Sequence, residues 1–342
     1  MLTRAGEPLS RWTTLRLGGP AARFVEVTTR AELYDVVAGA DSAEQPVLVL
    51  GGGSNLVVAD DGFPGTVAHV ATSGVRVSTD GCGLAEVEVE AGESWEAIVA
   101  RAVESEWVGV EALSGIPGSV GAVPIQNVGA YGQEVADSIV AVHVYDRAER
   151  RTRTLANTDC GFGYRTSVFK QKPDRYVVGG VTFRFRLGSQ GTPIWYDELA
   201  GTLGARPGQR VASATVRKAV LELRRAKGMV LDADDHDTWS AGSFFTNPVL
   251  PADDLPDGAP AWAQPDGRVK TSAAWLIEHA GLGKGFGNER VSLSTKHVLA
   301  LTNRGTAQTA DLLELARVVR ERVRGAYDID LRNEPVLVGC RL

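Results

Sequence analysis

The sequence is poor in the residues that build disulfide frameworks and metal centres. Only three of its 342 residues are cysteine, Cys82, Cys160 and Cys340, and they stand far apart with no CxxC pair. This usage is typical of a reducing compartment and predicts no structural zinc. The five histidines show no HExxH or other ligand spacing, so we expect no metal site.

Long apolar runs and an excess of positive charge are also missing. No segment approaches the roughly 20 apolar residues of a membrane-spanning helix, and the first 20 residues lack the hydrophobic core of a signal peptide. The 36 basic and 42 acidic residues give a net charge of −6, which argues against a nucleic acid or an anionic membrane as the main partner. We expect a cytoplasmic protein and, without a long exposed apolar stripe, a monomer.

The pattern of apolar residues predicts an α+β chain. Strands are expected at 24–27, 46–50, 66–70, 75–78, 85–89, 139–145, 151–155, 176–186 and 297–302. Capping residues predict helices that follow Thr29, Ser94 (over 95–105) and Thr271 (through 280). Two further helices are expected over 213–227 and 310–324, each ending before a glycine. The change in composition at 187–193 predicts a domain boundary.

Glycine is abundant, with 39 residues, and it clusters in a few loops. The first is GGGSNL (51–56), which follows a predicted buried strand. It is not a dinucleotide-binding GxGxxG, because Leu56 stands where the third glycine belongs and no helix follows. Backbone N–H groups in such a turn can still bind a pyrophosphate. A tight turn without a ligand is equally consistent with these six residues.

The second loop (113–132) holds five glycines and two prolines, and no charged residue lies between Glu111 and Glu134. A solvated loop of this length normally carries charge. A loop packed against a large, planar, partly apolar ligand needs slim residues and amides instead, here Ser119, Gln126 and Asn127. The alternative is a buried structural loop. Together the two loops suggest a dinucleotide held by backbone groups.

Five motifs, taken together, resemble the UDP-N-acetylenolpyruvoylglucosamine reductase (MurB) family. They are GGGSNL (51–56), GIPGSVGAVPIQNVGAYG (115–132), FGYRTSVFK (162–170), AGSFFTNP (241–248) and RNEP (332–335). IWYDEL (194–199) is similar to the type I form, which has an extra substrate-covering loop. The resemblance implies the FAD-binding PCMH, or vanillyl-alcohol-oxidase-like, fold. It implies two FAD-binding subdomains (1–73 and 74–190), a covering loop (191–211), a substrate-binding domain (212–330) and a C-terminal tail (331–342).

The activity implied by the resemblance is the NADPH-dependent reduction of UDP-N-acetylglucosamine enolpyruvate to UDP-N-acetylmuramate, a step of peptidoglycan precursor synthesis. Because the glycine-rich loops contain neither histidine nor cysteine, FAD is expected to bind non-covalently. Two rival interpretations are a flavin oxidase of the same fold that acts on an alcohol or sugar, and a module that binds a UDP-sugar without turnover. The acidic segments 231–239 and 253–257 would either weaken or steer the binding of anionic ligands.

The resemblance also implies roles for single residues. Ser243 matches the proton donor, Arg165 the arginine that holds the enolpyruvyl carboxylate, and Glu334 a glutamate that polarises or protonates the enolate. Without the motifs, they would be a loop serine, a surface ion-pair partner and an exposed acid. The residues expected to contact substrate are Tyr131, Tyr164, Tyr196, Lys227, Asn247 and His297. Those expected to bind FAD are Gly51, Gly52, Gly53, Ser54, Asn55, Gly115, Ile116, Pro117, Gly118, Ser119, Gln126, Asn127, Gly129 and Ala130.

Overall fold

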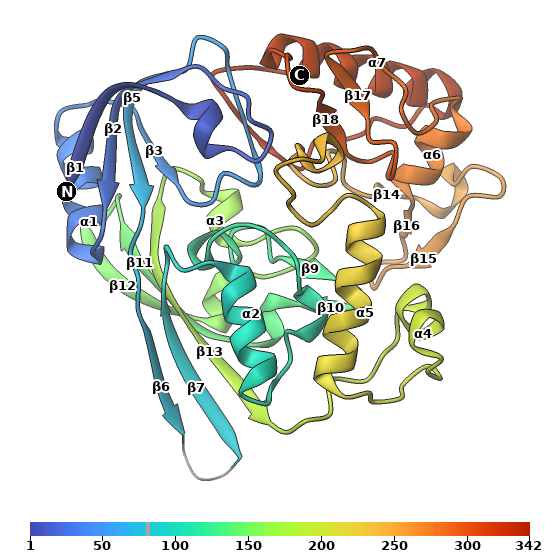
Figure 1. Cartoon of the computed structure of the whole chain (residues 1–342), viewed down its shortest axis with the longest axis horizontal. Helices are drawn as coiled ribbons and strands as arrows, with labels where there is room; N and C mark the ends of the chain where they lie inside the picture. The colour runs from blue at the N-terminus through green and yellow to red at the C-terminus, as the bar shows by residue number, and fades with distance from the viewer. Residues whose placement is uncertain (80–82) are drawn as a thin grey trace. The chain divides into compact units, whose positions relative to one another are not determined.

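The computed structural model describes residues 1–79 and 83–342, so Cys82 lies outside the described residues. The chain forms two compact units that alternate along the sequence (Figure 1). Unit 1 comprises Met1–Glu7, Ala21–Gly52 and Pro64–Arg225, and unit 2 comprises Pro8–Pro20, Gly53–Phe63 and Ala226–Leu342. Both units are discontinuous, and the sequential domain boundaries given above remain a prediction.

The first sheet of unit 1 has the strand order β1-β2-β5-β3. Its strands are β1 (Leu2–Pro8), β2 (Pro20–Val27), β5 (Phe63–Val70) and β3 (Val47–Leu50). Helix α1 (Arg30–Ser42) connects β2 to β3, and its cap is confirmed because the Thr29 hydroxyl accepts from the Glu32 N–H. β3 pairs with β5 in parallel, with Val47 opposite Thr66. β3 ends at Leu50 and leads directly into the first glycine-rich loop.

The second sheet of unit 1 is antiparallel, with the order β12-β11-β13-β7-β6 and with β8 beside β13. Its strands are β6 (Val75–Thr79), β7 (Leu84–Glu90), β8 (Trp107–Val108), β11 (Ile139–Asp146), β12 (Arg151–Ala156) and β13 (Tyr176–Leu187). The strand predicted at 176–186 is confirmed, and in its last part the buried Phe183 and Phe185 alternate with the exposed Arg184 and Arg186. Helix α2 (Trp95–Glu104) lies against this sheet (Figure 1) and packs Trp95 on Phe183.

The end of unit 1 consists mainly of helices around short hairpin strands. Strands β9 (Gly129–Ala130) and β10 (Gln133–Glu134) form a hairpin, and the short helix α3 (Val168–Gln171) follows β12. Helix α4 (Asp197–Leu203), which the sequence did not predict, packs on α5 (Ser213–Ala226). Their shared core contains Ile194, Leu199, Val216 and Val220, with Tyr131 packed at its edge. These contacts anchor residues 191–211, the expected covering loop (the covering segment below), to α5.

Unit 2 surrounds a single apolar core with short strands and two helices. The strands are β14 (Val249–Leu250), β15 (Ala261–Ala263), β16 (Val269–Thr271), β17 (Val291–Leu293) and β18 (Leu301–Asn303). Helices α6 (Ala273–His279) and α7 (Thr309–Tyr327) supply most of the core side chains. β4 (Leu56–Val58) pairs in parallel with β19 (Val336–Val338). The residues after the first glycine loop therefore meet the C-terminal segment.

Three local predictions in unit 2 were wrong. Ser272, not Thr271, caps α6 by accepting from the Trp275 N–H, while Thr271 closes β16. Helix α7 continues through Gly325 to Tyr327, and its C-cap residue Asp328 adopts a left-handed φ of 55°. The expected strand at 297–302 shrinks to β18, because the Ser294 hydroxyl accepts from the backbone of Lys296 and His297 and forms a turn there. Among the described residues, no helix is long and apolar enough to cross a membrane.

Candidate active site

The two glycine-rich loops of unit 1 approach each other backbone to backbone. A Cβ atom on Gly52 would lie 2.8 Å from the Cα of Gly118, and one on Gly51 would collide with the Ser119 hydroxyl. Only glycine permits this approach, so the surface that a ligand would meet is main chain without charged side chains. That surface fits FAD, because closely approaching backbone amides can bind a pyrophosphate and flank a planar ring.

The buried acid Glu111 closes one end of the uncharged segment. Its Oε1 accepts from Gln133 Nε2 at 2.9 Å and from the Thr192 N–H at 2.6 Å, and its Oε2 accepts from the Gly109 N–H at 2.8 Å. Gln133 also donates to the Thr192 hydroxyl. Glu111 forms no ion pair within the described part of the chain and is only 1 % exposed. One carboxylate therefore joins three loops through neutral donors.

Glu134, at the other end of this segment, binds Asn127. The Asn127 amide donates to Glu134 at 2.6 Å and to the Gly163 carbonyl at 3.1 Å, and its oxygen accepts from the Ala136 N–H. The two acids that border the uncharged segment thus both bind its amide side chains. Because the Asn127 side chain is engaged inside the protein, its expected contact with FAD would use the backbone.

Three expected site residues adopt the left-handed conformation that non-glycine residues rarely take. Their φ angles are 48° for Asn127, 50° for Tyr131 and 51° for Arg165. Each such residue costs on the order of 1 kcal/mol and persists only where its surroundings fix it. Arg165 is fixed by donating to the carbonyls of Gly129, at 2.7 Å, and Asn127. Backbone strain therefore coincides with the predicted site.

Tyr131 and Tyr196 meet edge to face, with ring centroids 5.5 Å apart. Tyr196 precedes α4, so this contact joins the covering segment to the second glycine loop. Burial raises the pKa of Tyr131 to about 12 and also raises that of Tyr196. Burial lowers the pKa of Arg224 on α5, and Tyr131 and Glu96 act in the opposite direction. The Tyr131 hydroxyl is therefore neutral at ordinary pH, and Arg224 acts on it electrostatically.

In unit 2 the backbone brings the Ser243 segment to the Glu334 segment. The Glu334 N–H donates to the Phe244 carbonyl at 2.8 Å, and Phe245 bridges Asn333. Asn55 lies on the other side, where its Nδ2 donates to the Glu334 carbonyl at 3.4 Å. Residues separated by almost 280 positions in the sequence therefore lie together. Of the three expected catalytic residues, Ser243 and Glu334 share unit 2 and Arg165 belongs to unit 1.

The other expected substrate residues are distributed over both units. Asn247 accepts from the Ala273 N–H at 3.0 Å, at the start of α6, so its amide oxygen serves the fold. His297 lies in the turn closed by Ser294. Tyr164 lies in unit 1 under the Arg165 guanidinium, which is 5.5 Å from its ring centroid. Lys227 follows α5, at the beginning of the last segment of unit 2. The substrate and FAD contacts of all these residues remain predictions.

Part of the acidic segment 231–239 is neutralised inside unit 2. Asp235 pairs with Lys296 at 2.5 Å, and the buried Asp237 pairs with Arg304 at 2.8 Å. Burial alone would raise the pKa of Asp237, but hydrogen bonds from Thr295 and Arg304 outweigh it and hold the pKa below its usual value. The segment is therefore partly structural, and its net field is weaker than its composition suggests.

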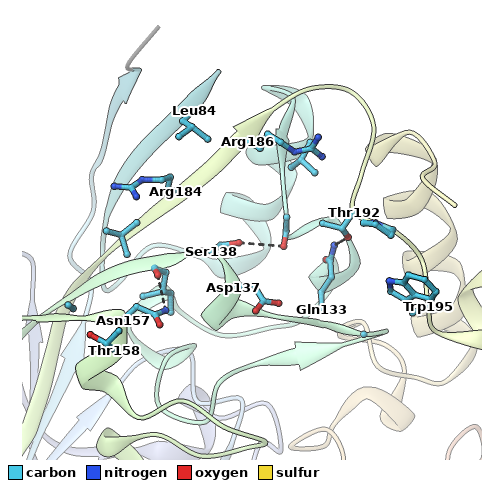
Figure 2. Close-up of a pocket in the computed structure, with 17 residues that line it drawn as sticks. Leu84, Gln133, Asp137, Ser138, Asn157, Thr158, Arg184, Arg186, Thr192 and Trp195 are labelled. Atoms are coloured by element: carbon cyan, nitrogen blue, oxygen red, sulfur yellow. Dashed lines mark hydrogen bonds between the residues drawn. The ribbon is translucent and has the colours of Figure 1, made fainter. Parts of the chain in front are cut away.

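A pocket of about 720 Å³ lies in unit 1 (Figure 2), and its lining includes none of the expected catalytic residues. Strands β7, β11 and β13 supply Leu84, Ile139 and Arg186, and the covering segment supplies Thr192 and the exposed Trp195. Its inner wall includes Gln133, so the pocket borders the loops that carry Tyr131 and Tyr196. No cluster of histidine, cysteine and acidic residues suited to a metal occurs in the described residues.

Sequence reasoning missed the polar residues that position these loops. None of the five motifs contains these residues, which are Glu96, Glu111, Arg217 and Arg224. The one available signal was the placement of Glu111 and Glu134 at the borders of a long uncharged segment. The partners of Glu96 and Glu111 lie as many as 121 positions away, which spacing cannot reveal.

The fold is that of an FAD-dependent oxidoreductase. Residues 21–154 match the model of the FAD binding domain, and residues 234–338 match that of the UDP-N-acetylenolpyruvoylglucosamine reductase C-terminal domain. The chain belongs to the UDP-N-acetylenolpyruvoylglucosamine reductase family, and the FAD-binding PCMH-like fold expected from its motifs is confirmed.

Individual relatives resemble the chain over nearly its whole length. It is 56 % identical to the UDP-N-acetylenolpyruvoylglucosamine reductase of Cutibacterium acnes, over 98 % of this chain and 90 % of the relative. The enzyme of that name from Thermobifida fusca is 55 % identical, over 98 % of both chains. A crystal structure of the reductase from Thermus caldophilus is similar with a TM-score of 0.63 at 28 % identity, covering 98 % of each chain.

Proposed function

We propose that this chain reduces UDP-N-acetylglucosamine enolpyruvate to UDP-N-acetylmuramate with NADPH, for peptidoglycan precursor synthesis. Relatives that are named for this reductase and match 98 % of this chain support the proposal. The observation that carries it within the molecule is the pairing of the Ser243 and Glu334 segments, which lie together through the Phe244–Glu334 hydrogen bond. A module that only binds a UDP-sugar would not need a hydroxyl and a carboxylate on paired segments.

Reduction of the enol ether requires a hydride on one vinyl carbon and a proton on the other. FAD, when bound, supplies the hydride that it takes from NADPH. The chain itself must stabilise the negative charge that the substrate acquires and must deliver the proton. Gly51, Gly52 and the loop around Gly118 would hold FAD through their backbone.

Ser243 is proposed as the proton donor to the α-carbon. A hydroxyl is a weak acid, but the carbanion is a strong base, so a positioned serine suffices where water is excluded. Ser243 is partly buried, and it lies between Gly242, with φ of 72°, and the buried Phe244, whose N–H donates to the Leu299 carbonyl at 2.7 Å. This backbone support fixes the position of the hydroxyl-bearing residue.

Arg165 and Glu334 are proposed to act on the substrate carboxylate and the enolate. The planar fork of a guanidinium matches a carboxylate, whose charge grows in the transition state. The carbonyls of Gly129 and Asn127 fix the direction of the Arg165 side chain before substrate binds. Glu334 would polarise or protonate the enolate beside it. Tyr131, Tyr164, Tyr196, Lys227, Asn247 and His297 are proposed to contact the UDP-sugar.

The decisive experiment is an assay of NADPH oxidation with and without the enolpyruvyl substrate. We expect oxidation that depends on the substrate and a purified protein that is yellow. Ser243→Ala should abolish turnover while NADPH still reduces the flavin in a single half-reaction. An Ser243→Ala variant with full turnover would falsify the proton-donor role, and NADPH oxidation driven by oxygen alone would favour a flavin oxidase.

A further inference from the structure

The first turn of α2 contacts both ends of the cofactor loop Gly115–Gly118. The Trp95 N–H donates to the Gly118 carbonyl at 3.0 Å. The adjacent Glu96 accepts, through Oε2, from the Gly115 N–H in a short hydrogen bond. Two neighbouring residues of one helix therefore hold both ends of a four-residue loop, and Glu96 does so through its side chain.

The Gly115 amide sets the path of the loop. Gly115 has a φ of 74°, where a side chain would be strained, and the chain then enters Ile116 and Pro117. Because Pro117 has a fixed φ, fewer dihedral angles are free between Gly115 and Gly118. The orientation of the peptide that carries the Gly115 N–H therefore influences the direction of the main chain toward Gly118. The Glu96 carboxylate orients that peptide through its N–H. A charged acceptor makes a stronger bond than a neutral one.

The Glu96 carboxylate is held in turn by α5. Its Oε1 accepts from Arg217 Nη2 at 2.5 Å, and both side chains are partly shielded from solvent. Arg224 lies two turns further along the same face of α5, and the charge of Glu96 counteracts the effect of burial on it. The second amino group of Arg217 is buried and has no hydrogen-bond partner among the described residues. One carboxylate thus connects α2, the cofactor loop and Arg217 of α5.

We propose that Glu96 is a positioning residue for FAD, which orients the Gly115 peptide, with Arg217 holding the carboxylate in place. The inference rests on the proposed function only in taking FAD as the ligand of this loop. It predicts that Glu96 and Arg217 act as one unit on the retention of FAD. A purely structural ion pair would instead affect the melting temperature and leave the retention of the flavin unchanged.

The test measures how fast FAD leaves the purified holoenzyme, followed by the rise of flavin fluorescence after dilution. Glu96→Gln places an N–H₂ group opposite one of the two donors, so release should accelerate about tenfold, the value of a hydrogen bond to a charged group. Arg217→Met should accelerate release by a similar factor, and the double variant should not exceed Glu96→Gln by more than about twofold. The control is Glu104→Gln, an exposed acid at the end of α2, with unchanged release.

Release from Glu96→Gln within twofold of the wild-type rate would overturn the proposal, as would effects of the two single variants that multiply in the double variant. If Glu96→Gln does not fold, Arg217→Lys decides the matter. It keeps the charge but loses the fork, and we expect release to accelerate less than in Arg217→Met. The assay contains neither NADPH nor the enolpyruvyl substrate, so a failure of the proposed reduction and a failure of this inference give different results.

Discussion

The backbone N–H of Glu334 donates to the carbonyl oxygen of Phe244 at 2.8 Å. This bond places the C-terminal RNEP motif against the AGSFFTNP motif, one residue from Ser243, and Asn55 completes the contact from the other side. The side chain of Glu334 takes no part in the Phe244 bond. Its carboxylate can therefore be changed while the backbone pairing remains.

Glu334→Gln should reduce turnover with the enolpyruvyl substrate and spare the fold. We expect kcat to fall about 10²–10³-fold, the usual loss when a positioned acid or a charge-stabilising group is removed. Reduction of the flavin by NADPH should keep its rate, which stopped-flow absorbance would measure. Glu289→Gln, an exposed acid of the same unit, serves as the control. Equal loss in both half-reactions would show that Glu334 acts through the fold or the flavin and not on the substrate.

The edge-to-face contact of Tyr131 and Tyr196 predicts a role for the Tyr196 ring in holding the substrate. Tyr196→Ala should raise KM for the UDP-sugar about tenfold, because an aromatic pair contributes about 0.5–1.5 kcal/mol beyond its buried area. Tyr196→Phe keeps the ring and should change KM far less. Since burial raises the pKa of Tyr131 to about 12, Tyr131 should cause no inflection in the pH profile below pH 11. A large effect of Tyr196→Phe would assign the role to the hydroxyl.

Glu111 should stabilise the covering segment locally. Glu111→Ala removes the acceptor for Gly109, Gln133 and Thr192, and buried donors without partners cost about 1–3 kcal/mol each. We expect faster hydrogen exchange at the Gly109 and Thr192 amides and a lower melting temperature. Gly191→Ala should act in the same direction, because its Cβ would lie 2.7 Å from Glu111 Oε1. The exposed Glu104→Ala is the matched control, and unchanged exchange at Thr192 would refute the anchoring role.

Much of the fold followed from local patterns in the sequence. The caps of α1 and α2, the strand over 176–186 and the absence of a helix after the first glycine-rich loop are all local features, and all are confirmed. Helix α4 was missed because it is short and its apolar residues are few. The ends of α6 and α7 were misplaced because Thr271 and Gly325 also suit a cap. In the structure Thr271 is the last residue of β16, and Ser272 and Asp328 are the caps.

Only part of the candidate site could be predicted from the sequence. Motifs identified the loops and the residues expected to perform chemistry, since glycine spacing and polar residues are visible in a sequence. The residues that position these loops could not be predicted. The hydrogen bonds between Glu111 and Thr192 and between Arg217 and Glu96 form only when distant segments fold together. The left-handed backbone of Asn127, Tyr131 and Arg165 had no signal either, as none of them is glycine.

Asp237 predicts how the stability of unit 2 depends on pH. Burial alone would raise its pKa, but hydrogen bonds from the Thr295 hydroxyl, the Thr295 N–H and Arg304 lower it below the unfolded value of about 3.9. A carboxyl with a depressed pKa in the folded state contributes stability above its unfolded pKa and loses it as the pH falls through the folded value.

Asp237→Asn should therefore lower the melting temperature at pH 7, with a loss of about 1–3 kcal/mol for a buried hydrogen-bonded charge. The difference in melting temperature between Asp237→Asn and the wild type should decrease as the pH falls below about 4. The wild-type carboxylate is then protonated, so it no longer stabilises the fold more than the neutral amide does. Thermal melts of both proteins between pH 7 and pH 3 would measure this difference. Asp234→Asn, an exposed acid of the same segment, should give no such gap at any pH. A gap for Asp237→Asn that stays constant down to pH 3 would show that packing, not the charge, sets its contribution.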